Sequence, residues 1–554
     1  MNRPKWQILP FSASPRAGWP DLPPFLIQLL CNRGMVDPSQ ALSFLSADAS
    51  LLLNPFLLPD MDRAVARLRR ALERGEGVVI YGDFDADGVS ATVLLVQGLA
   101  SLGGKAIPYI PHRLDEGYGL NHSALERLAQ QGITLVVTVD CGIGNGEEIA
   151  RAKERGMEVI VTDHHIVPPE LPPAVAVVDP KREGSAYPFP GLAGVGVAFK
   201  LLQALGADWR PYLDLVALGT VTDLMPVNGE NRYLVKQGLA ALRATSRPGL
   251  RELMLQARLA PECADEEAIA YLLGPRLNAA GRVDHAIVSY KLLITSSPAE
   301  AQALARDLEE RNALRQRWTE EVLEKAHRKI EDHRLPLVMV GGEDYPAGVV
   351  GLVASRLCDE YYRPAVVVEV GPEVSRGSAR SIPEFNIVAA LAQCRHLLTR
   401  FGGHAQAAGF ALPTPNLEAL RECLMELAAR QVPADLRPIL PIDAEMSLAS
   451  LSGEIVRWTR ELEPFGRGNR PPTFLSRGVK VLEARPVGGG KHMRLKLRQG
   501  EMTWHAMGFG LGPLLAEVSP ALDIVYTLEM EARERSPLLR LNLLDFAPST
   551  SSQP

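Results

Sequence analysis

Three runs of apolar, mostly β-branched residues each lead into an acidic residue, and this pattern restricts the fold more than any other feature of the chain. The runs span residues 78–81, 134–139 and 158–162, and the acidic residues after them are Asp83, Asp140 and Asp163. Stretches typical of helices separate the runs, with glycine and proline between them, as a parallel α/β sheet requires. Because ligands of such sheets gather beyond the carboxyl ends of the strands, we expect the acidic residues to converge on one site.

The first acidic segment, Asp83-Phe84-Asp85-Ala86-Asp87-Gly88, places three carboxylates on alternate residues. A second segment, Asp163-His164-His165, adds imidazoles, and Asp223 follows the apolar stretch 213–221. Carboxylates with imidazoles suit Mn²⁺ or Mg²⁺. An EF-hand calcium loop opens with the same spacing, but Leu94 stands where its bidentate glutamate is required. A solvated acidic turn is the other alternative, and the repeated acidic strand ends favour a metal site over it.

Four segments in order, YGDFDADG, VTVDCG, TDHH and LGTVTDLMP, resemble the successive motifs of the DHH phosphoesterase superfamily. Three more, GPRLNAAGR at 274–282, SARS at 378–381 and GGHAQAAGF at 402–410, resemble the RecJ family of single-strand-specific exonucleases. The resemblance spans most of the chain. It implies an enzyme that degrades single-stranded DNA from the 5′ end to mononucleotides, by hydrolysis with two ions of Mn²⁺ or Mg²⁺, in DNA repair and recombination.

The resemblance also implies which residues hold the metal ions. Six side chains would do so: Asp83 and Asp85 for the first ion, Asp87, His164 and Asp223 for the second, and Asp140 for both. Tyr81 departs from the superfamily, in which a ligand histidine is frequent at this position, and Asp83 would serve in its place. His165 would face the substrate phosphate, with a purely structural role as the alternative.

A second group of residues would bind the substrate. It comprises Arg113, Asn278, Arg282, Ser378, Arg380, Gly402, Gly403 and His404. His404 would act with Asp140 and His165 in catalysis by contacting the scissile phosphate, and the two glycines before it let backbone approach the anion. Arg113, Ser378 and Arg380 would receive the terminal 5′ phosphate and set the direction of digestion. Asn278 and Arg282 would contact the adjacent phosphate or brace the site.

Two rival classes stand beside this interpretation. One is a DHH hydrolase of short oligonucleotides, cyclic dinucleotides or pyrophosphate, which would lack a long connector and a basic barrel. The other is a non-catalytic scaffold of the DHH kind, which would have lost metal ligands, whereas every acidic ligand is present here.

The chain is long enough for several domains, because 46% of its 554 residues are hydrophobic. It divides into six parts: an N-terminal cap segment at 1–50, a catalytic α/β domain with a parallel sheet at 51–297, a connector helix at 298–333, an α/β DHH-associated domain at 334–437, an OB-fold β-barrel at 438–547 and a disordered tail at 548–554. A stretch rich in Ala, Leu, Glu and Arg predicts the helix, and its lack of a clean heptad disfavours a coiled-coil arm. The resemblance implies the DHH-associated domain and the OB-fold.

Basic residues gather in the C-terminal part, although the formal net charge of the chain is −6. Between residues 467 and 498, nine basic residues accompany a single acidic one, Glu483. Alternation over residues 494–498 predicts a strand with one basic face that neutralises DNA phosphates, with a solvated face as the alternative. Phe474 and Trp504 could stack on bases, but aromatic residues at strand spacing usually face inward, so we expect both in the core.

Cysteine usage and hydropathy indicate a cytoplasmic protein. The six cysteines form no C-x-x-C pair, so we expect neither a zinc ribbon nor a disulfide framework, and we expect reduced thiols. Cys141 is expected to be a small buried residue rather than a ligand. No apolar run reaches the ~18 residues of a membrane span, and residues 1–6 lack the apolar region of a signal peptide. We expect a monomer that binds single-stranded DNA and no membrane, with a single-strand-binding protein and a helicase as candidate partners.

Overall fold

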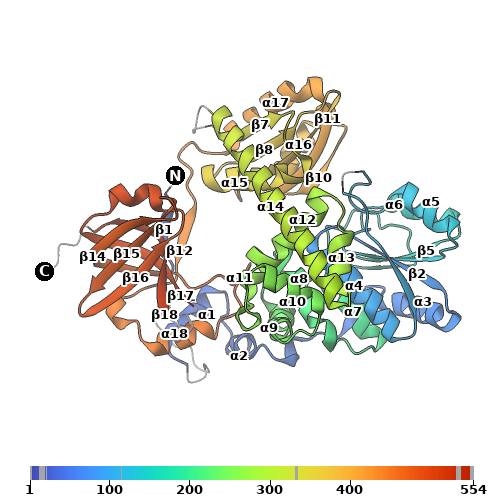
Figure 1. Cartoon of the computed structure of the whole chain (residues 1–554), viewed down its shortest axis with the longest axis horizontal. Coiled ribbons are helices and arrows are strands. Elements are labelled where there is room, and N and C mark those ends of the chain that lie inside the picture. Colours follow the sequence, from blue (N-terminus) through green and yellow to red (C-terminus); the bar gives the residue numbers. More distant parts are fainter. Residues whose placement is uncertain are drawn as a thin grey trace.

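The computed structural model describes residues 3–10, 19, 22–113, 115–330, 335–531 and 538–549. In Figure 1 a β-barrel lies at the left, a smaller α/β unit at the top and a larger α/β unit at the right. The helix α14 (Pro298–Lys329) runs between the two α/β units. The predicted fold class, two α/β parts joined by a long helix and followed by a barrel, is confirmed.

The larger α/β unit, here called the catalytic unit, is built on a fully parallel five-stranded sheet. Its strands, in spatial order, are β3 (Lys105–Tyr109), β2 (Gly77–Gly82), β4 (Leu135–Val139), β5 (Glu158–Thr162) and β6 (Ala176–Val178). The three apolar runs of the sequence are thus the adjacent strands β2, β4 and β5. β-Branched residues fill them because helices cover both faces of the sheet. Their carboxyl ends lie side by side at one edge.

Helices on the two faces bury this sheet. One face packs against α3 (Met61–Arg74), α4 (Ala86–Ser101) and α7 (Gly194–Leu205), and the other against α5 (His122–Gln130) and α6 (Gly146–Glu154). Beyond the first face lies a helical layer of α8 (Leu213–Thr222), α9 (Gly229–Arg243), α10 (Pro248–Gln256), α11 (Glu266–Ala268), a π-helical turn at Ile269–Leu273, α12 (Gly274–Val283) and α13 (Ile287–Ile294). α14 packs on this layer and then on α15 of the next unit, so it connects the two.

The smaller α/β unit, here called the second unit, has a mixed sheet. Its strands, in spatial order, are β10 (Arg400–His404), β11 (Ala407–Pro413), β9 (Val374–Arg380), β8 (Ala365–Glu369) and β7 (Val338–Gly342). Only β7 and β8 pair in parallel. The helices are α15 (Ala347–Tyr361), α16 (Ile387–Gln393) and α17 (Leu417–Gln431).

The prediction of reduced cysteines is wrong for one pair. Cys394, directly after α16, forms a disulfide with Cys423 of α17. No sequence motif marks the pair, because the two residues meet only where α16 packs against α17. Cys141 is fully buried, as predicted.

The C-terminal unit is a closed β-barrel. Its strands are β13 (Ala444–Glu445), β14 (Phe474–Val487), β15 (His492–Gln499), β16 (Met502–Gly508), β17 (Ala521–Glu531) and β18 (Leu538–Pro548), and the pairing of β14 with β17 closes it. α18 (Gly453–Arg460) precedes β14. Phe474 and Trp504 lie in the core, with 0% and 9% of their surface exposed, which confirms the prediction for both.

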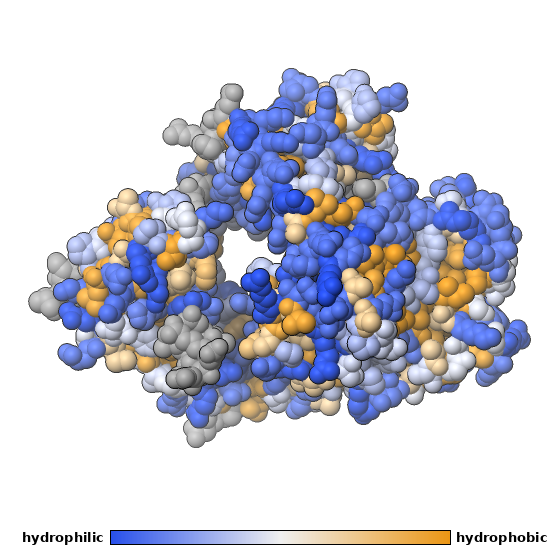
Figure 2. Space-filling model, viewed as in Figure 1, coloured by the Kyte–Doolittle hydropathy of each residue, from blue (hydrophilic) through white to orange (hydrophobic). Residues whose placement is uncertain are grey.

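The N-terminal segment packs on this C-terminal barrel. Strand β1 (Lys5–Ile8) pairs in parallel with β12 (Ile439–Ile442), and the apolar sides of α1 (Pro24–Asn32) and α2 (Pro38–Ser46) join the barrel's hydrophobic core. The barrel and the two α/β units enclose an open passage through the molecule, which Figure 2 shows at its centre.

Short 3₁₀ helices punctuate the connections. They are Ala49–Leu51, Pro55–Leu57, Arg210–Tyr212, Pro261–Cys263, Arg395–Leu397, Thr414–Asn416, Leu448–Ser450 and Gly512–Glu517. In the part of the chain that the structure describes, no helix is both long and apolar enough to cross a membrane. Residues 550–554 of the predicted disordered tail lie outside the described residues.

Candidate metal centre and substrate site

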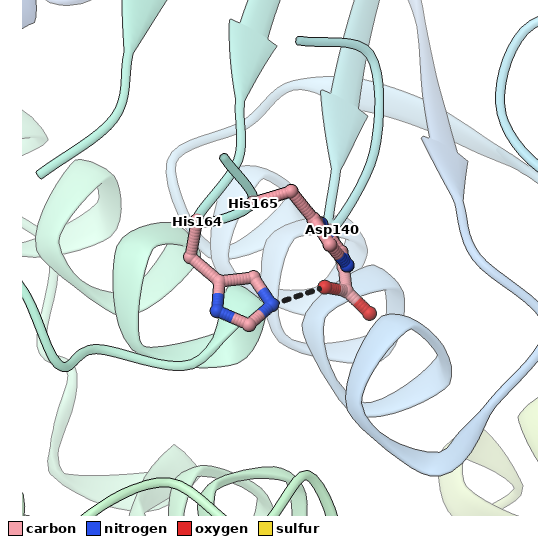
Figure 3. A group of neighbouring side chains, drawn as sticks. All are labelled: Asp140, His164 and His165. Carbon is pink, nitrogen blue, oxygen red and sulfur yellow. Dashed lines mark ion pairs between the residues drawn. The ribbon is translucent and has the colours of Figure 1, made fainter. Parts of the chain in front are cut away.

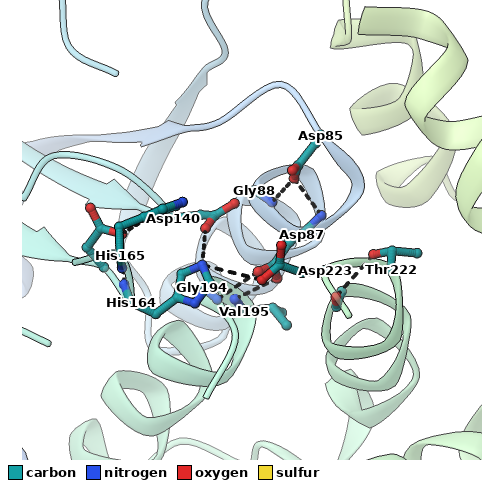
Figure 4. Close-up of polar contacts among 12 residues, drawn as sticks. Asp85, Asp87, Gly88, Asp140, His164, His165, Gly194, Val195, Thr222 and Asp223 are labelled. Carbon is teal, nitrogen blue, oxygen red and sulfur yellow. Dashed lines mark hydrogen bonds and ion pairs between the residues drawn. The ribbon is translucent and has the colours of Figure 1, made fainter. Parts of the chain in front are cut away.

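Six acidic and histidine side chains converge at the carboxyl edge of the parallel sheet. Figure 4 shows five of them: Asp85, Asp87, Asp140, His164 and Asp223. Their potential ligand atoms form two groups, each with all atoms within 4.8 Å of one another: Asp83, Asp85 and Asp140, and Asp87, His164 and Asp223. Asp83 follows β2, Asp140 follows β4 and His164 lies two residues after β5. Asp85 and Asp87 lie at the start of α4, and Asp223 is the C-cap of α8. A third group, Asp140, His164 and His165, overlaps both. All six residues that the resemblance implies as ligands therefore lie together, although Asp140 belongs to the group of Asp83 and Asp85 and not to that of Asp87 and Asp223.

His164 links the two groups. Its Nε2 lies 3.0 Å from Oδ1 of Asp140 and 3.5 Å from Oδ2 of Asp223, and Figure 3 shows the first of these contacts. Burial lowers the pKa of His164 to about 3, so its ring is neutral. One of the two ring nitrogens then has a lone pair available for a metal ion.

Several buried polar atoms of the cluster make no hydrogen bond, although some of them lie near one another. Among the described residues, Oδ1 of Asp83, Oδ1 of Asp140, Oδ2 of Asp223 and both ring nitrogens of His164 are buried without a hydrogen bond. Native proteins rarely leave buried polar atoms in this condition. Divalent cations would satisfy these oxygens and nitrogens, so the residues present fit a pair of such ions.

The charge of the cluster also favours the binding of divalent cations. Burial and the neighbouring carboxylates raise the pKa of Asp83 and of Asp140 well above the ordinary value. The same two causes raise the pKa of Asp87 to about 7 and that of Asp223 to about 8. The protein therefore places more negative charge here than its own cations balance, and hard cations would stabilise the ionised carboxylates.

Local backbone structure fixes the carboxylates. Asp85 caps α4 by accepting hydrogen bonds from the N–H groups of Asp87 (2.9 Å) and Gly88 (3.1 Å). Both oxygens of Asp87 accept from the first turn of α7, from Gly194 N–H at 2.7 Å and Val195 N–H at 2.9 Å. Asp87 thus lies against a helix N-terminus, where negative charge is stabilised.

Two glycines let helices approach the cluster closely. A Cβ atom on Gly194 would lie 2.4 Å from Cβ of Asp140, and one on Gly219 would lie 2.4 Å from Oδ1 of Asp87. Asp140 itself has a φ of 61°, a conformation that few side chains other than Asn and Asp adopt. Neither glycine tolerates a side chain without movement of a carboxylate.

Tyr81 lies outside the cluster. Its hydroxyl donates to the carbonyl oxygen of Gly119 at 3.0 Å, and its ring stacks on Tyr109 with centroids 4.8 Å apart. It packs on the sheet face that α5 and α6 cover, so no ligand atom comes from this position.

His165 and His404 face each other across the two α/β units. Their rings are nearly parallel, with centroids 6.2 Å apart and an interplanar angle of 10°. Nδ1 of His165 lies 2.7 Å from Asp163. Burial opposes the charged ring, but the hydrogen bond to Asp163 and its charge prevail and raise the pKa of His165 to about 9. Burial lowers the pKa of His404, so the pair combines a cationic ring with a neutral one.

Three arginines of the predicted substrate group meet between the units. Burial, with Arg113 and Arg380 nearby, lowers the pKa of Arg282 to about 9. Arg380 donates to the hydroxyl of Ser378 at 3.1 Å, and Arg282 donates to the carbonyl of Gly348, in the first turn of α15, at 3.2 Å. Crowded, half-buried guanidinium groups next to a helix N-terminus have the chemistry to bind an anion.

The remaining predicted residues have separate places. Asn278 accepts the N–H of Ala86 at 2.7 Å, so it braces the start of α4. Gly402 and Gly403 are exposed on β10, before His404, and Gly403 has a φ of 139° that favours glycine.

The structure adds two residues to the site that the sequence analysis missed. The hydroxyl of Tyr118 lies 3.1 Å from the carbonyl oxygen of Asp140 and 3.0 Å from Nδ1 of His165. Lys181 donates to the carbonyl oxygen of His164. The glycines on both sides of Tyr118 indicate a loop that could place an aromatic residue near the site, whereas nothing in the sequence marks Lys181.

A basic face on the barrel is formed by Lys480, Arg494, Lys496 and Arg498. Residues Met493, Leu495 and Leu497 point into the core, so the three basic residues between and after them point outward, and Lys480 pairs with Arg498 across the strands. Within the described ranges none of the four has an ion pair, whereas Arg470 and Arg477 pair with Asp443 and Asp523.

Comparisons with known proteins follow the same divisions. Residues 77–220 match the DHH family N-terminal domain, 335–430 the DHHA1 domain and 442–545 the RecJ OB domain. The chain is 37% identical over 518 residues to the single-stranded-DNA-specific exonuclease RecJ of Bacillus subtilis, covering 92% of this chain and 66% of that protein. It is 34% identical over 564 residues to RecJ of Dickeya dadantii, covering 96% and 95%.

Solved structures agree. The crystal structure of RecJ from Thermus thermophilus in complex with Mn²⁺ matches with a TM-score of 0.86 and 32% identity, covering 99% of this chain and 80% of that chain. The Mg²⁺ complex of the same protein matches with a TM-score of 0.79 and 30% identity, covering 99% and 79%.

Proposed function

Because the chain belongs to the RecJ family of single-stranded-DNA-specific exonucleases, we propose that it digests single-stranded DNA from the 5′ end to mononucleotides by two-metal hydrolysis, in DNA repair and recombination. The family makes it a metal-dependent exonuclease that uses Mn²⁺ or Mg²⁺. The proposal includes the direction of digestion, the use of two ions and the role in repair and recombination. It also includes a cytoplasmic location, a monomeric state and partners such as a single-strand-binding protein or a helicase.

The two ligand groups support a pair of ions. Asp83, Asp85 and Asp140 would hold one, and Asp87, His164 and Asp223 the other, with Asp140 shared. Two such ions activate water and stabilise the attacking and leaving oxygens of a phosphodiester. Hydrogen bonds from α4 and α7 already orient the carboxylate oxygens of Asp85 and Asp87, so these ligands need not rearrange when the ions bind.

His165 and His404 would act on the phosphate from opposite sides. Asp163 holds His165 in its cationic form, so its ring can donate a charged hydrogen bond to a phosphate oxygen. His404 comes from the second unit, so the two histidines meet the same phosphate only when both units are in place.

The single observation that carries the direction is the cluster of Arg113, Arg282 and Arg380 between the units. It presents three like charges and the Ser378 hydroxyl, and the described residues provide no carboxylate that pairs with Arg282 or Arg380. A terminal phosphate carries more charge than an internal one and has no chain beyond it. A 5′-terminal phosphate would therefore occupy this pocket, with the next phosphodiester at the metal ions.

The test is digestion of strands labelled at one end or the other, with a 5′ phosphate or a 5′ hydroxyl. We expect release of mononucleotides from the 5′ end and a preference for the phosphorylated strand. Arg380→Ala should lower that preference about tenfold while metal binding stays unchanged. Arg376→Ala, four residues earlier on β9 and exposed, is the matched control. Release that begins at the 3′ end would refute the proposal.

A further inference from the structure

Arg232 of α9 is fully buried, lies outside the metal centre and takes no part in the proposed chemistry. We infer that Arg232 is a positioning residue that fixes the barrel on the catalytic unit, and that this placement sets the affinity for long single strands. The inference rests on the proposed function in one respect, because it assumes that a strand extends from the metal centre to the barrel.

All five N–H donors of the Arg232 guanidinium have acceptors, and every acceptor is a backbone carbonyl oxygen. Nε donates to Phe44 (2.5 Å), Nη1 to Leu462 (3.0 Å) and Pro464 (3.4 Å), and Nη2 to Glu461 (3.2 Å) and Glu463 (2.8 Å). The guanidinium also lies over the ring of Phe44, 3.6 Å from its centroid. One side chain of the catalytic unit thus joins the N-terminal segment to the loop that leads into the barrel.

Further contacts hold the same loop, here called the junction loop (residues 461–469). The N–H of Phe465 donates to the carboxylate of Glu266 at 2.6 Å, and the N–H of Val227 donates to the carbonyl of Arg467 at 2.7 Å. A Cβ atom on Gly466 would lie 2.7 Å from Cγ2 of Val227, so the backbone of the loop packs closely against the Val227 side chain. The contacts from Val227, Arg232 and Glu266 come from three separate places in the catalytic unit.

The chemistry of Arg232 points to orientation rather than to simple cohesion. Within the part of the chain that is described, it has no ion pair, although its charge is fully buried. An apolar side chain would bury the same area without the cost of desolvating a charge. A planar fork that needs five carbonyl groups in fixed directions admits only one placement of the loop.

The covalent connection does not set this placement. Between the end of α17 and the start of β12, residues 432–438 contain no helix or strand, and Arg363 of the second unit, not the catalytic unit, holds them through the carbonyls of Ala434 (2.7 Å) and Leu436 (3.1 Å). The barrel's core continues into α1 and α2, so the N-terminal segment moves with the barrel. The junction loop therefore decides how the basic face (Lys480, Arg494, Lys496 and Arg498) is turned relative to the metal centre.

The experiment compares wild-type protein with Arg232→Met, Arg232→Lys and Glu266→Ala. Lys236→Met is the control, because Lys236 lies one turn further on α9 and also donates to the N-terminal segment, to the carbonyls of Leu45 (3.5 Å) and Ser46 (3.1 Å), but neither bond reaches the junction loop. The Kd of metal-free protein is measured by fluorescence anisotropy for strands of about 4 and about 40 nucleotides, of which only the longer can span both sites. With Mn²⁺, kcat and KM are measured for the same strands.

We expect Arg232→Met to raise Kd and KM for the long strand about tenfold, and to leave kcat and KM for the short strand unchanged. Lysine has three donors instead of five and should restore only part of the loss. Glu266→Ala should act in the same direction while the buried guanidinium of Arg232 stays in place. It tests the inference independently if the Arg232 variants fail to fold. Small-angle scattering should show a larger radius of gyration for Arg232→Met and none of this change for Lys236→Met.

Three results would overturn the inference. The first is an unchanged Kd for the long strand in folded Arg232→Met and Glu266→Ala. The second is an equal loss on both strands, which would make Arg232 a general structural residue. The third is wild-type binding that does not depend on length. An absence of hydrolysis by the wild type, with length-dependent binding retained, would contradict the proposed function and leave the positioning role supported.

Discussion

Replacing Gly194 by alanine should remove most of the metal affinity while making the helix that carries it slightly more stable. Gly194 is the first residue of α7, and alanine is favoured over glycine within helices by up to about 1 kcal/mol. The added Cβ would lie 2.4 Å from Cβ and 2.6 Å from Cγ and Oδ1 of Asp140. Carbon atoms in contact prefer separations of about 3.5 Å, so Asp140 and α7 must move apart by about 1 Å.

Neither Asp140 nor the start of α7 can move without disturbing the metal ligands. The N–H of Gly194 is bonded to Asp87, and the N–H of Asp140 donates to the carbonyl of Thr162 at 3.1 Å. Ligand distances in metal sites are defined to about 0.2 Å, so a shift of about 1 Å removes Asp140 as a ligand. We expect the Kd for Mn²⁺ to rise about 100-fold, which corresponds to about 2.7 kcal/mol.

Calorimetric titration of metal-free protein with Mn²⁺ measures this loss. Gly146→Ala is the matched control, because Gly146 is also the first residue of a helix, α6, and a Cβ there meets nothing within 4 Å. Wild-type affinity in Gly194→Ala would refute the geometric argument, and so would an equal loss in Gly146→Ala.

Three further predictions address the chemistry, the barrel and pH. Asp140→Ala should lower hydrolysis by at least about 10³ and leave strand binding nearly unchanged, because it removes the ligand shared by both groups; anisotropy and turnover assays check this, and near-normal turnover would contradict the two-metal assignment. Substituting glutamine for Arg494, Lys496 and Arg498 together should reduce the slope of log K against log salt by about 2, whereas Arg477→Gln, whose charge is already paired, should change it little. Burial raises the pKa of Glu266 from 4.5 to about 7, so the folded state holds a proton that the unfolded state has lost, and Glu266 makes stability fall as pH rises between these values. Glu266→Gln should flatten that fall in thermal melts at pH 5 and 7; an identical pH dependence in both proteins would contradict the assignment.

The acidic strand ends were predictable because two local signals coincide there. Period and composition mark β2, β4 and β5 as buried strands, and the order of a parallel α/β sheet brings their ends together without any knowledge of side-chain contacts. The long helix α14 was predictable for a similar reason, since 32 residues without an internal glycine or proline leave few other conformations.

The parts that escaped prediction depend on contacts between distant segments. Tyr118 enters the site only because its loop folds over the end of β4, and Cys394 meets Cys423 only through the packing of two helices. Arg232 looks like any surface arginine of an amphipathic helix. Only the structure shows that carbonyl groups more than 180 residues away in either direction surround it.

The pairing of the two ends of the chain has a consequence for biosynthesis. Leu26, Leu29, Leu30 and Phe44 of the N-terminal segment leave the ribosome first, but the barrel residues that cover them follow roughly 400 residues later, a delay of about 20–80 s at ordinary elongation rates. During this interval the catalytic and second units can fold, while α1 and α2 keep their apolar faces in contact with water. A nascent chain of this protein is therefore an expected client of ribosome-associated chaperones, and the last strands to emerge complete a core that the first helices began.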